Sequence, residues 1–175
     1  MEAAAELIAE VGWGRVTTRA VAAKAGLPHG AVSYHFAGKQ QLLVEAALKA
    51  FERAFQPEEF ARLDSIEEVI AGFETELRSV SGSPAIAALM LEAMREAERD
   101  AELRDRLGTL LRRARQAVAD VARRDEGLSG LSASPETIAA LLIAVGDGLL
   151  LHCLIDPELD VGAQFAALHA MLAGA

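Results

Sequence analysis

The stretch from Thr17 to Lys39 constrains the fold of this 175-residue chain more than any other part of it. It contains two short helical patterns joined by a tight turn at residues 25–27. Thr17 is a good N-cap, because its hydroxyl can accept a hydrogen bond from a free N–H of the first turn. Gly26 can adopt the left-handed conformation that ends a helix, and Pro28 suits the start of the next one. The stretch therefore predicts two helices that meet at a sharp turn.

The second of these helices has an apolar and a polar face. Leu27 is predicted to plug the turn, and Val32 and Phe36 form the inward stripe. Two helices joined by a short turn that contains Gly are typical of the helix-turn-helix motif, whose second helix lies in the major groove of DNA. The outward face suits that role, since Gly30 allows a close approach of DNA and Tyr34 can donate a hydrogen bond. The alternative is an ordinary helical hairpin with a polar face.

The pattern Thr…Ala-x-x-Ala-Gly-Leu, followed by Tyr34-His35-Phe36 and Lys39, resembles the DNA-binding domain of the TetR family of transcriptional regulators over about residues 3–52. The resemblance implies phosphate contacts from Thr17 and Arg19. It implies that the groove is faced by Pro28, His29, Gly30 and Ser33. It implies that the DNA backbone is clamped by Tyr34, His35 and Lys39.

Two departures from the family pattern stand out. Position 28 often carries Ser or Thr in the family, which caps the recognition helix and can bond a phosphate, whereas Pro28 can do neither. Family members also usually begin with a basic arm and a longer first helix, whereas this chain starts at Met1, already inside that helix. A truncated chain or a late start would account for the missing arm.

The charge of the chain is unevenly distributed. The net charge is −9, but residues 1–51 hold five basic and four acidic residues, and the acidity lies in residues 52–175, with 12 basic and 22 acidic residues. The first part is thus weakly positive, which supports a local DNA face without proving one. A single cysteine, Cys153, excludes an internal disulfide framework and agrees with a reducing cytoplasm. No cationic, cleavable leader is present at the N-terminus, and we expect a cytoplasmic protein.

The remaining chain also has helical periodicity, without strand alternation or hairpin turns. We predict an all-α fold of about nine helices. The helices are expected at residues 2–11, 17–25, 28–36, 39–55, 65–81, 84–99, 101–124, 136–155 and 161–172. Gln56-Pro57 ends the fourth helix, which divides the chain into a DNA-binding domain at 1–55 and a C-terminal ligand-binding and dimerisation domain at 56–175.

The helix at 136–155 is nearly uncharged. A membrane span of that length usually lacks charge, and because Asp147 interrupts it we expect a buried helix and no membrane partner. In the TetR family the last two long helices pack against those of a partner as a four-helix interface, and the resemblance implies the same homodimer here. The alternative is that both helices are buried within one monomer. The expected interface residues are Leu149, His152, Phe165, Leu168 and Leu172.

A small-molecule effector site is the second expectation for the C-terminal domain. Methionine adapts to varied partners, and the residues that could line a cavity are Phe73, Leu77, Met90, Met94, Leu111 and Leu142. Simple core packing is the alternative for each of them. Asp147 is a charge in an apolar helix and needs a partner, which is either an arginine from the helix at 101–124 or a polar group of a ligand. Residues 146–157 also resemble the C-terminal domain of the BetI-like branch.

These patterns together predict a homodimeric transcriptional repressor. It is expected to bind pseudo-palindromic operator DNA and to be released from it by a small-molecule effector. One alternative is a small α-helical enzyme or storage protein that uses Asp147, His152 and Cys153. The spacing speaks against it, because the three residues do not share a face and no Glu-x-x-His or His-x-x-x-His pattern is present. Another alternative is a regulator without a ligand. We expect no catalytic residue, no metal site and no cofactor.

Overall fold

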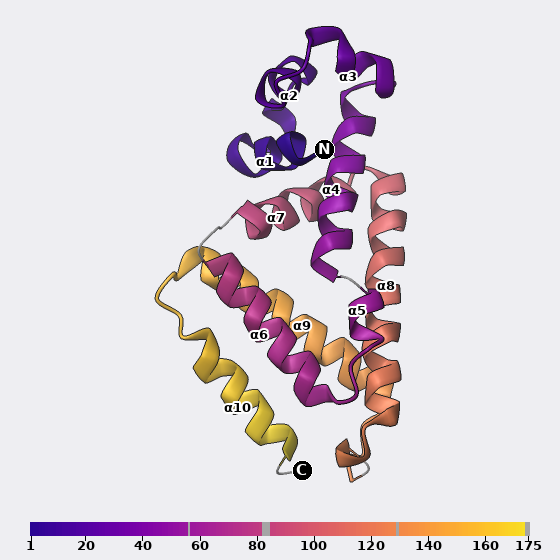
Figure 1. The fold of residues 1–175 in the computed structure, drawn as a ribbon, viewed down its shortest axis with the longest axis vertical. Helices are drawn as coiled ribbons and strands as arrows, with labels where there is room; N and C mark the ends of the chain where they lie inside the picture. Colours follow the sequence, from indigo (N-terminus) through magenta and orange to yellow (C-terminus); the bar gives the residue numbers. More distant parts are fainter. Residues whose placement is uncertain (56, 82–84, 129, 174–175) are drawn as a thin grey trace. The chain divides into compact units, whose positions relative to one another are not determined.

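The computed structural model describes residues 1–55, 57–81, 85–128 and 130–173, and this part of the chain is helical without strands (Figure 1). The elements are α1 (Glu2–Val11), the 3-10 turn η1 (Trp13–Arg15), α2 (Thr18–Lys24), α3 (His29–His35), α4 (Lys39–Phe55), α5 (Pro57–Phe60), α6 (Ile66–Ser81), α7 (Ala85–Ala97), α8 (Ala101–Arg124), η2 (Glu126–Leu128), α9 (Pro135–Ile155) and α10 (Val161–Ala173). The predicted all-α class is confirmed. Within the described residues the one unpredicted α-helix is α5, a single turn that follows the predicted end of α4.

The chain divides into two compact units. Unit 1 comprises Met1–Ala54 and Ala85–Leu110, and unit 2 comprises Phe55–Pro84 and Leu111–Ala175. Helix α7 and the start of α8 therefore group with the N-terminal helices, although they lie far along the sequence. The division of domains at residues 55 and 56 stays a prediction, because packing units and folding domains need not coincide.

Unit 1 is built around the apolar faces of α1, α4 and α7. Ile8, Leu42 and Leu43 are fully buried in it, and α1 lies directly against α7. Gly12 ends α1 with a φ of 78°, a left-handed conformation that only glycine adopts without strain. The chain can therefore turn sharply into η1, where Trp13 is buried, as is Val16 directly after it.

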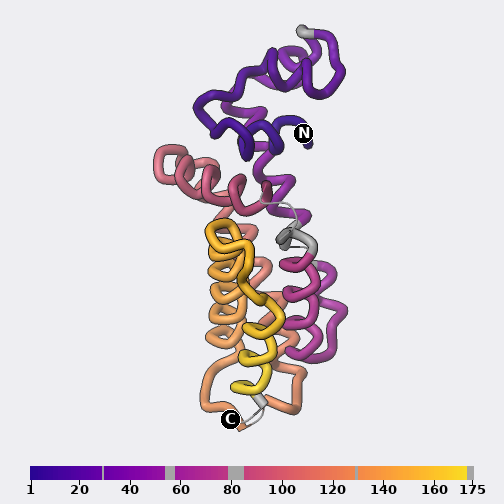
Figure 2. The backbone as a smooth tube through the Cα atoms, turned by 90° about the vertical axis from the view of Figure 1, so that its left-hand side faces the viewer, coloured from indigo at the N-terminus to yellow at the C-terminus, as the bar shows by residue number. Residues whose placement is uncertain are grey.

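In unit 2, α6 packs against both α9 and α10 (Figures 1 and 2). Helix α6 begins at an arrangement close to a standard capping box. The Glu68 N–H donates to Ser65 Oγ at 3.2 Å, but the Glu68 carboxylate accepts from the N–H of Asp64, one residue earlier than the standard capping box would have it. Val69 of α6 and Phe165 of α10 are fully buried, so α10 is held on its own chain by an apolar contact surface.

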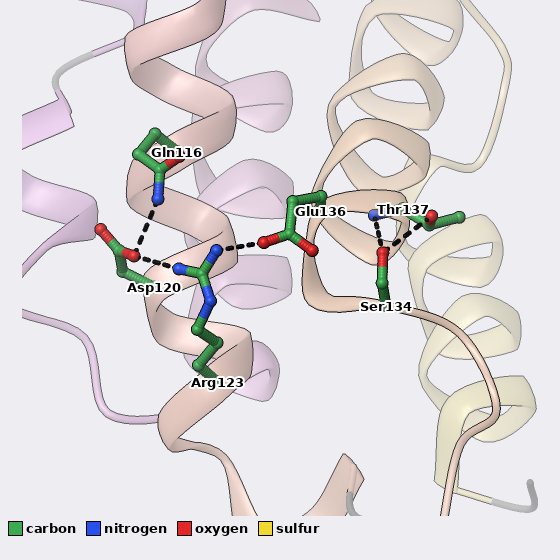
Figure 3. Close-up of polar contacts among 6 residues, drawn as sticks. All are labelled: Gln116, Asp120, Arg123, Ser134, Glu136 and Thr137. Atoms are coloured by element: carbon green, nitrogen blue, oxygen red, sulfur yellow. Dashed lines mark hydrogen bonds and ion pairs between the residues drawn. The ribbon is translucent and has the colours of Figure 1, made fainter.

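Polar contacts join the end of α8 to the start of α9 (Figure 3). Arg123 forms ion pairs with Asp120 on its own helix and with Glu136 in the first turn of α9. Gln116 donates to Asp120 at 3.0 Å, and the Thr137 N–H donates to the N-cap Ser134 at 3.2 Å. These bonds fix the angle at which the chain enters α9 after the connection from α8.

Some local expectations need correction. Leu27 is 52% exposed, so it does not plug the turn. Pro28 occupies the N-cap of α3 and precedes the helix, where the sequence pattern placed it in the first turn. Phe36 lies just beyond α3 in an extended conformation and is half-buried. The predicted break at 81–84 falls mostly on residues 82–84, which lie outside the described residues, and Ser81 is still part of α6.

Candidate nucleic-acid interface and effector site

Helix α2 is capped at both ends, at the positions that the sequence predicts. Thr17 Oγ1 accepts from the Ala20 N–H at 3.1 Å at the start of α2. At its end, the Leu27 N–H donates to the Ala22 carbonyl at 2.9 Å and the Gly26 N–H donates to the Ala23 carbonyl at 3.2 Å. With Gly26 at a φ of 66°, this is a Schellman motif. It fixes the direction in which α3 leaves the turn.

Helix α3 presents a polar face to solvent. Tyr34 is 86% exposed, and its ring meets that of His35 edge to face, with ring centroids 5.1 Å apart. The buried Val32 anchors the opposite side of the helix. The other predicted DNA contacts that are exposed are Thr17, Arg19, Pro28, Gly30, Ser33 and His35. For His29 only the backbone is described. An exposed tyrosine without apolar cover is suited to a partner that offers hydrogen bonds.

The two lysines nearest to this face have partners within the chain. Lys24 pairs with Glu10 at 2.7 Å and Glu6 at 3.1 Å, and these bonds raise the pKa of its ammonium above the ordinary value. Lys39 Nζ donates to the Gly14 carbonyl at 2.7 Å. The family resemblance implies that Lys39 clamps the DNA backbone. In the structure one of its three N–H groups already ties α4 to η1, which leaves the other donors for a phosphate.

A polar network connects this region to α7. The Trp13 N–H donates to Glu92 Oε2 at 2.6 Å, and the Trp13 indole N–H donates to Gln40 Oε1 at 3.2 Å. The Gln40 amide in turn donates to Glu96 at 3.2 Å and to Asp100 at 2.8 Å. Bonds from the Leu103 N–H and then from Gln40 lower the pKa of Asp100. Sequence reasoning missed Gln40 and Glu92, because no local pattern pairs residues so far apart.

A second link joins α4 to α8 within unit 1. The Arg106 guanidinium donates to both oxygens of Glu45, and its second contact measures 3.1 Å. The paired arginine lowers the pKa of Glu45, and the carboxylate raises that of Arg106. A bidentate pair fixes orientation as well as distance. The helix that follows the recognition helix is therefore held in place at two points along its length.

The residues predicted to line an effector cavity do not all fall in one unit. Met90 and Met94 belong to unit 1, whereas Phe73, Leu77, Leu111, Leu142 and Asp147 belong to unit 2. Within unit 2, Phe73 meets Phe60 of α5 edge to face at 5.4 Å, and its ring lies 4.0 Å from where a Cβ of Gly146 would be. A side-chain carbon at position 146 would meet this ring in ordinary van der Waals contact, so α6 and α9 lie side by side at this level.

Away from the residues predicted to line the effector cavity, the structure contains an open groove of about 580 Å³ between α6 and α10. Its charged lining consists of Glu67, Glu74, Arg78, Asp160 and His169, and none of the predicted cavity residues borders it. Glu74 pairs with Arg78 at 2.8 Å, and Glu67 faces His169 at 3.5 Å. Gly162 allows this arrangement, because a Cβ there would lie 2.0 Å from the Arg78 guanidinium.

Asp147 does not form an ion pair with an arginine of α8, which was one of the two partners expected for it. Arg115 of α8 is near enough for its charge to act on Asp147, yet the described residues provide Asp147 with no ion pair within 4.0 Å and no hydrogen bond. Burial raises the pKa of this carboxyl to about 6, and the attraction of Arg115 only partly offsets that shift. The Asp147 side chain is therefore half-buried and unpaired.

Replacing Asp147 by Asn should stabilise the chain at neutral pH. The folded-state pKa of about 6 lies above the ordinary value of 3.8, so the native state loses stability as the pH rises from about 4 through 6. Because the group is partly exposed, we expect a gain of about 1–2 kcal/mol at pH 7.5. Urea unfolding at pH 7.5 and pH 4, without effector, measures it. A variant as stable as the parent at pH 7.5 would contradict the desolvation of Asp147.

Helices α9 and α10 leave an apolar face uncovered in the single chain. Leu141 is 61% and Ile155 is 85% exposed on α9, and Met171 is a large exposed apolar residue of α10. Sequence reasoning did not single out these three. Of the predicted interface residues, His152 is exposed, Leu149, Leu168 and Leu172 are half-buried, and Phe165 is 1% exposed. Helix α9 is long and apolar enough to span a membrane by length and composition, a property that core helices share.

In the described part of the chain, no three His, Cys, Asp or Glu side chains are grouped in a way that could hold a metal ion. His152 and Cys153 follow one another near the end of α9, where His152 is exposed and Cys153 is half-buried. The expectation of a protein without a metal site stays a prediction.

Comparisons with known proteins agree with the fold and the motif. Residues 1–46 match the family described as bacterial regulatory proteins, tetR family, and residues 64–175 match the tetracyclin repressor-like C-terminal domain. The latter description does not refer to the BetI-like branch, so that resemblance stays a prediction. No curated protein matches the chain.

Three solved structures are similar in fold. The fatty acid degradation regulator FadR from Bacillus halodurans is 17% identical, with a TM-score of 0.78 over 98% of this chain and 91% of that one. FadR from Bacillus subtilis, in complex with stearoyl-CoA, is 16% identical, with a TM-score of 0.75 over 98% and 94%. A putative regulator from Saccharomonospora viridis, in complex with choline, is 22% identical, with a TM-score of 0.76 over 98% and 92%.

The two family matches together span most of the sequence. The likenesses in fold and the Schellman turn before α3 agree with them. The chain belongs to the TetR family of transcriptional regulators.

Proposed function

We propose that this regulator is a homodimeric repressor that binds a pseudo-palindromic operator through α3 and releases it when a small molecule binds in the C-terminal region. The observation that carries the DNA-binding part is the exposed polar face of α3, which includes Tyr34, together with the turn before it, which is fixed by capping bonds. Thr17, Arg19, Ser33, Tyr34, His35 and Lys39 are the proposed contacts to phosphates and bases. Such a protein would work in the cytoplasm, where the DNA is.

Dimerisation is supported by the exposed apolar face of α9 and α10. Large apolar side chains that stay in water cost free energy unless a partner covers them. A second copy would place a second α3 against the next major groove, which predicts half-sites one helical turn apart.

The effector part is supported by the network between α7 and the N-terminal helices. A ligand can shift an equilibrium only through its different affinity for two conformations. Displacement of α7 would change the bonds of Glu92 to Trp13 and of Glu96 to Gln40, and with them the positions of η1 and α4. Two relatives in fold, one with stearoyl-CoA and one with choline, support a small-molecule effector without identifying it.

Selection of bound sequences from a random duplex library tests this function. We expect enrichment of a pseudo-palindromic site whose affinity falls steeply with salt, because phosphate contacts release counterions. Absence of any enriched sequence at low salt would overturn the DNA-binding proposal. A single enriched half-site bound by a monomer would overturn the homodimer.

Replacing Tyr34 by Ala should weaken binding to the operator and to unrelated duplexes alike. A phosphate contact positions the protein without reading sequence, so both affinities are expected to fall about 5- to 30-fold. Fluorescence anisotropy on operator and scrambled duplexes measures this. Tyr34→Phe separates the hydroxyl from the ring. A loss confined to the operator would instead assign Tyr34 to base recognition.

Removal of the Glu92 side chain should destabilise unit 1. Glu92→Ala leaves the half-buried Trp13 N–H without its acceptor, which is expected to cost about 1–3 kcal/mol in the free energy of unfolding. Denaturant unfolding of Glu92→Ala measures this, with Glu98→Ala as the matched control because Glu98 is exposed. Equal stability of the two variants would show that the Trp13–Glu92 bond does not hold α7 in place.

A further inference from the structure

Gln40 connects three parts of unit 1 through one amide group. It is the second residue of α4, and its Oε1 accepts from the Trp13 indole N–H of η1 at 3.2 Å. Its Nε2 donates to Glu96 Oε1 of α7 at 3.2 Å and to Asp100 Oδ2 at 2.8 Å. Asp100 directly precedes α8, and its other oxygen accepts from the Leu103 N–H in the first turn of that helix. The start of α4 is thus bonded to η1, to α7 and to the start of α8.

This combination of bonds requires an amide. An amide side chain has an acceptor oxygen and two N–H donors, so it can accept from an indole and donate to two carboxylates at once. A glutamate at position 40 would have no donor for Glu96 and Asp100, and a lysine or an arginine would have no acceptor for Trp13. The two acidic side chains and the indole therefore meet at the type of group that can bind all three.

Gln40 also lies close to the point where the recognition helix joins α4. Residues 36–38 alone separate α3 from α4, so the position of the first turn of α4 limits where the C-terminal end of α3 can lie. Lys39, which precedes Gln40, donates to the Gly14 carbonyl of η1 at 2.7 Å. Two of the proposed DNA contacts, Tyr34 and Lys39, are therefore tethered to Gln40 by a short length of chain.

We propose that Gln40 is the positioning residue through which α7 and the start of α8 hold the DNA-binding face in place. The inference rests on the proposed function, since it names the connection by which a displacement of α7 would reach the recognition helix. Gln40 acts through α4 and Lys39 and not by a contact of its own with DNA. Without its bonds, the end of α3 and Lys39 would have to be ordered when DNA binds, and that ordering lowers the affinity.

Gln40→Glu tests the proposal on the full chain. The carboxylate keeps an acceptor for Trp13 but has no donor, and it adds a third negative charge beside Glu96 and Asp100. Its affinity is measured by fluorescence anisotropy on the duplex enriched from the random library and on a scrambled duplex of the same length at low salt. Both affinities should fall about tenfold, because a positioning residue affects phosphate contacts and base contacts alike.

Gln41→Glu is the matched control for the added charge. It lies one residue further along α4, and a carboxylate there still accepts from the Ala37 N–H, as Gln41 Oε1 does at 2.7 Å. The affinity of this variant should stay within about twofold of the parent, because a single exposed charge contributes little.

Gln40→Ala removes the bonds without adding a charge and should lower the affinity about fivefold. It also tests the proposal if denaturant unfolding shows that Gln40→Glu does not fold. Trp13 is the only tryptophan of the chain, so its fluorescence reports on the bond to Gln40 in the absence of DNA. The emission should shift in Gln40→Ala, because the buried indole loses its acceptor.

An exchange of the two bonded groups separates positioning from a general loss of stability. In Gln40→Glu/Glu96→Gln the amide and the carboxylate change places, so the side chain at position 96 can donate to the one at position 40, and most of the lost affinity should return. Gln40→Glu/Glu98→Gln has the same net charge, but Glu98 is exposed and is not a partner of Gln40. This second pair should not recover.

Equal affinities of Gln40→Glu and Gln41→Glu would overturn the inference and leave the proposed function intact. Full affinity or an unchanged Trp13 emission in Gln40→Ala overturns it as well, as does equal recovery with Glu96→Gln and Glu98→Gln. A parent chain that binds neither duplex overturns the proposed function, and this inference with it.

Discussion

Leu141→Glu is expected to convert the dimer into a folded monomer that no longer binds its operator with high affinity. Leu141 lies on the uncovered apolar face of α9 and is 61% exposed in the single chain, so a glutamate there does not disturb the fold of the monomer. In a dimer the same carboxylate would be buried without a partner in both copies. Each unpaired buried charge costs about 3–5 kcal/mol, so the dimer dissociation constant should rise by at least about a hundredfold.

Sedimentation or light scattering over a range of protein concentrations measures this change. Leu91→Glu is the matched control, because Leu91 is also an exposed leucine of a helix but lies on α7 in unit 1. The control should keep the dimer. A Leu141→Glu variant that dimerises like the parent would show that the exposed face of α9 is not the interface.

Phe165→Ala is expected to lower the free energy of unfolding by about 3–5 kcal/mol, because it removes the largest fully buried side chain of the described chain. The sequence pattern predicted Phe165 as an interface residue. In the structure its side chain is buried within its own unit, where α10 packs against α6. The cavity left by alanine would loosen α10 itself.

The monomeric Leu141→Glu background separates the two roles of this residue. If Phe165 belongs to the core of one chain, the loss of 3–5 kcal/mol should persist in that monomer, whereas Met171→Ala should stay within about 0.5 kcal/mol because Met171 is exposed. Urea unfolding at one protein concentration provides the comparison. If the loss in the free energy of unfolding is absent in the monomer, Phe165 is an interface residue as first predicted.

The sequence was sufficient for features that depend on neighbouring residues. Thr17 and Gly26 mark the ends of α2, and each acts as predicted, because a cap is a bond between residues two to five positions apart. Helical periodicity likewise predicted α8 and α9 to within one residue. The family pattern around Tyr34 depends on the same short spacings.

Tertiary packing decided the rest. No local pattern pairs Trp13 with Glu92 or Arg106 with Glu45, since these contacts join residues 61 to 79 positions apart. An apolar residue on a helix is equally compatible with core or interface from sequence alone. Only the arrangement of helices buries Phe165, exposes Leu141 and leaves Asp147 unpaired. Burial is a property of surfaces that meet in space, whereas a helix and its caps are properties of a segment of chain.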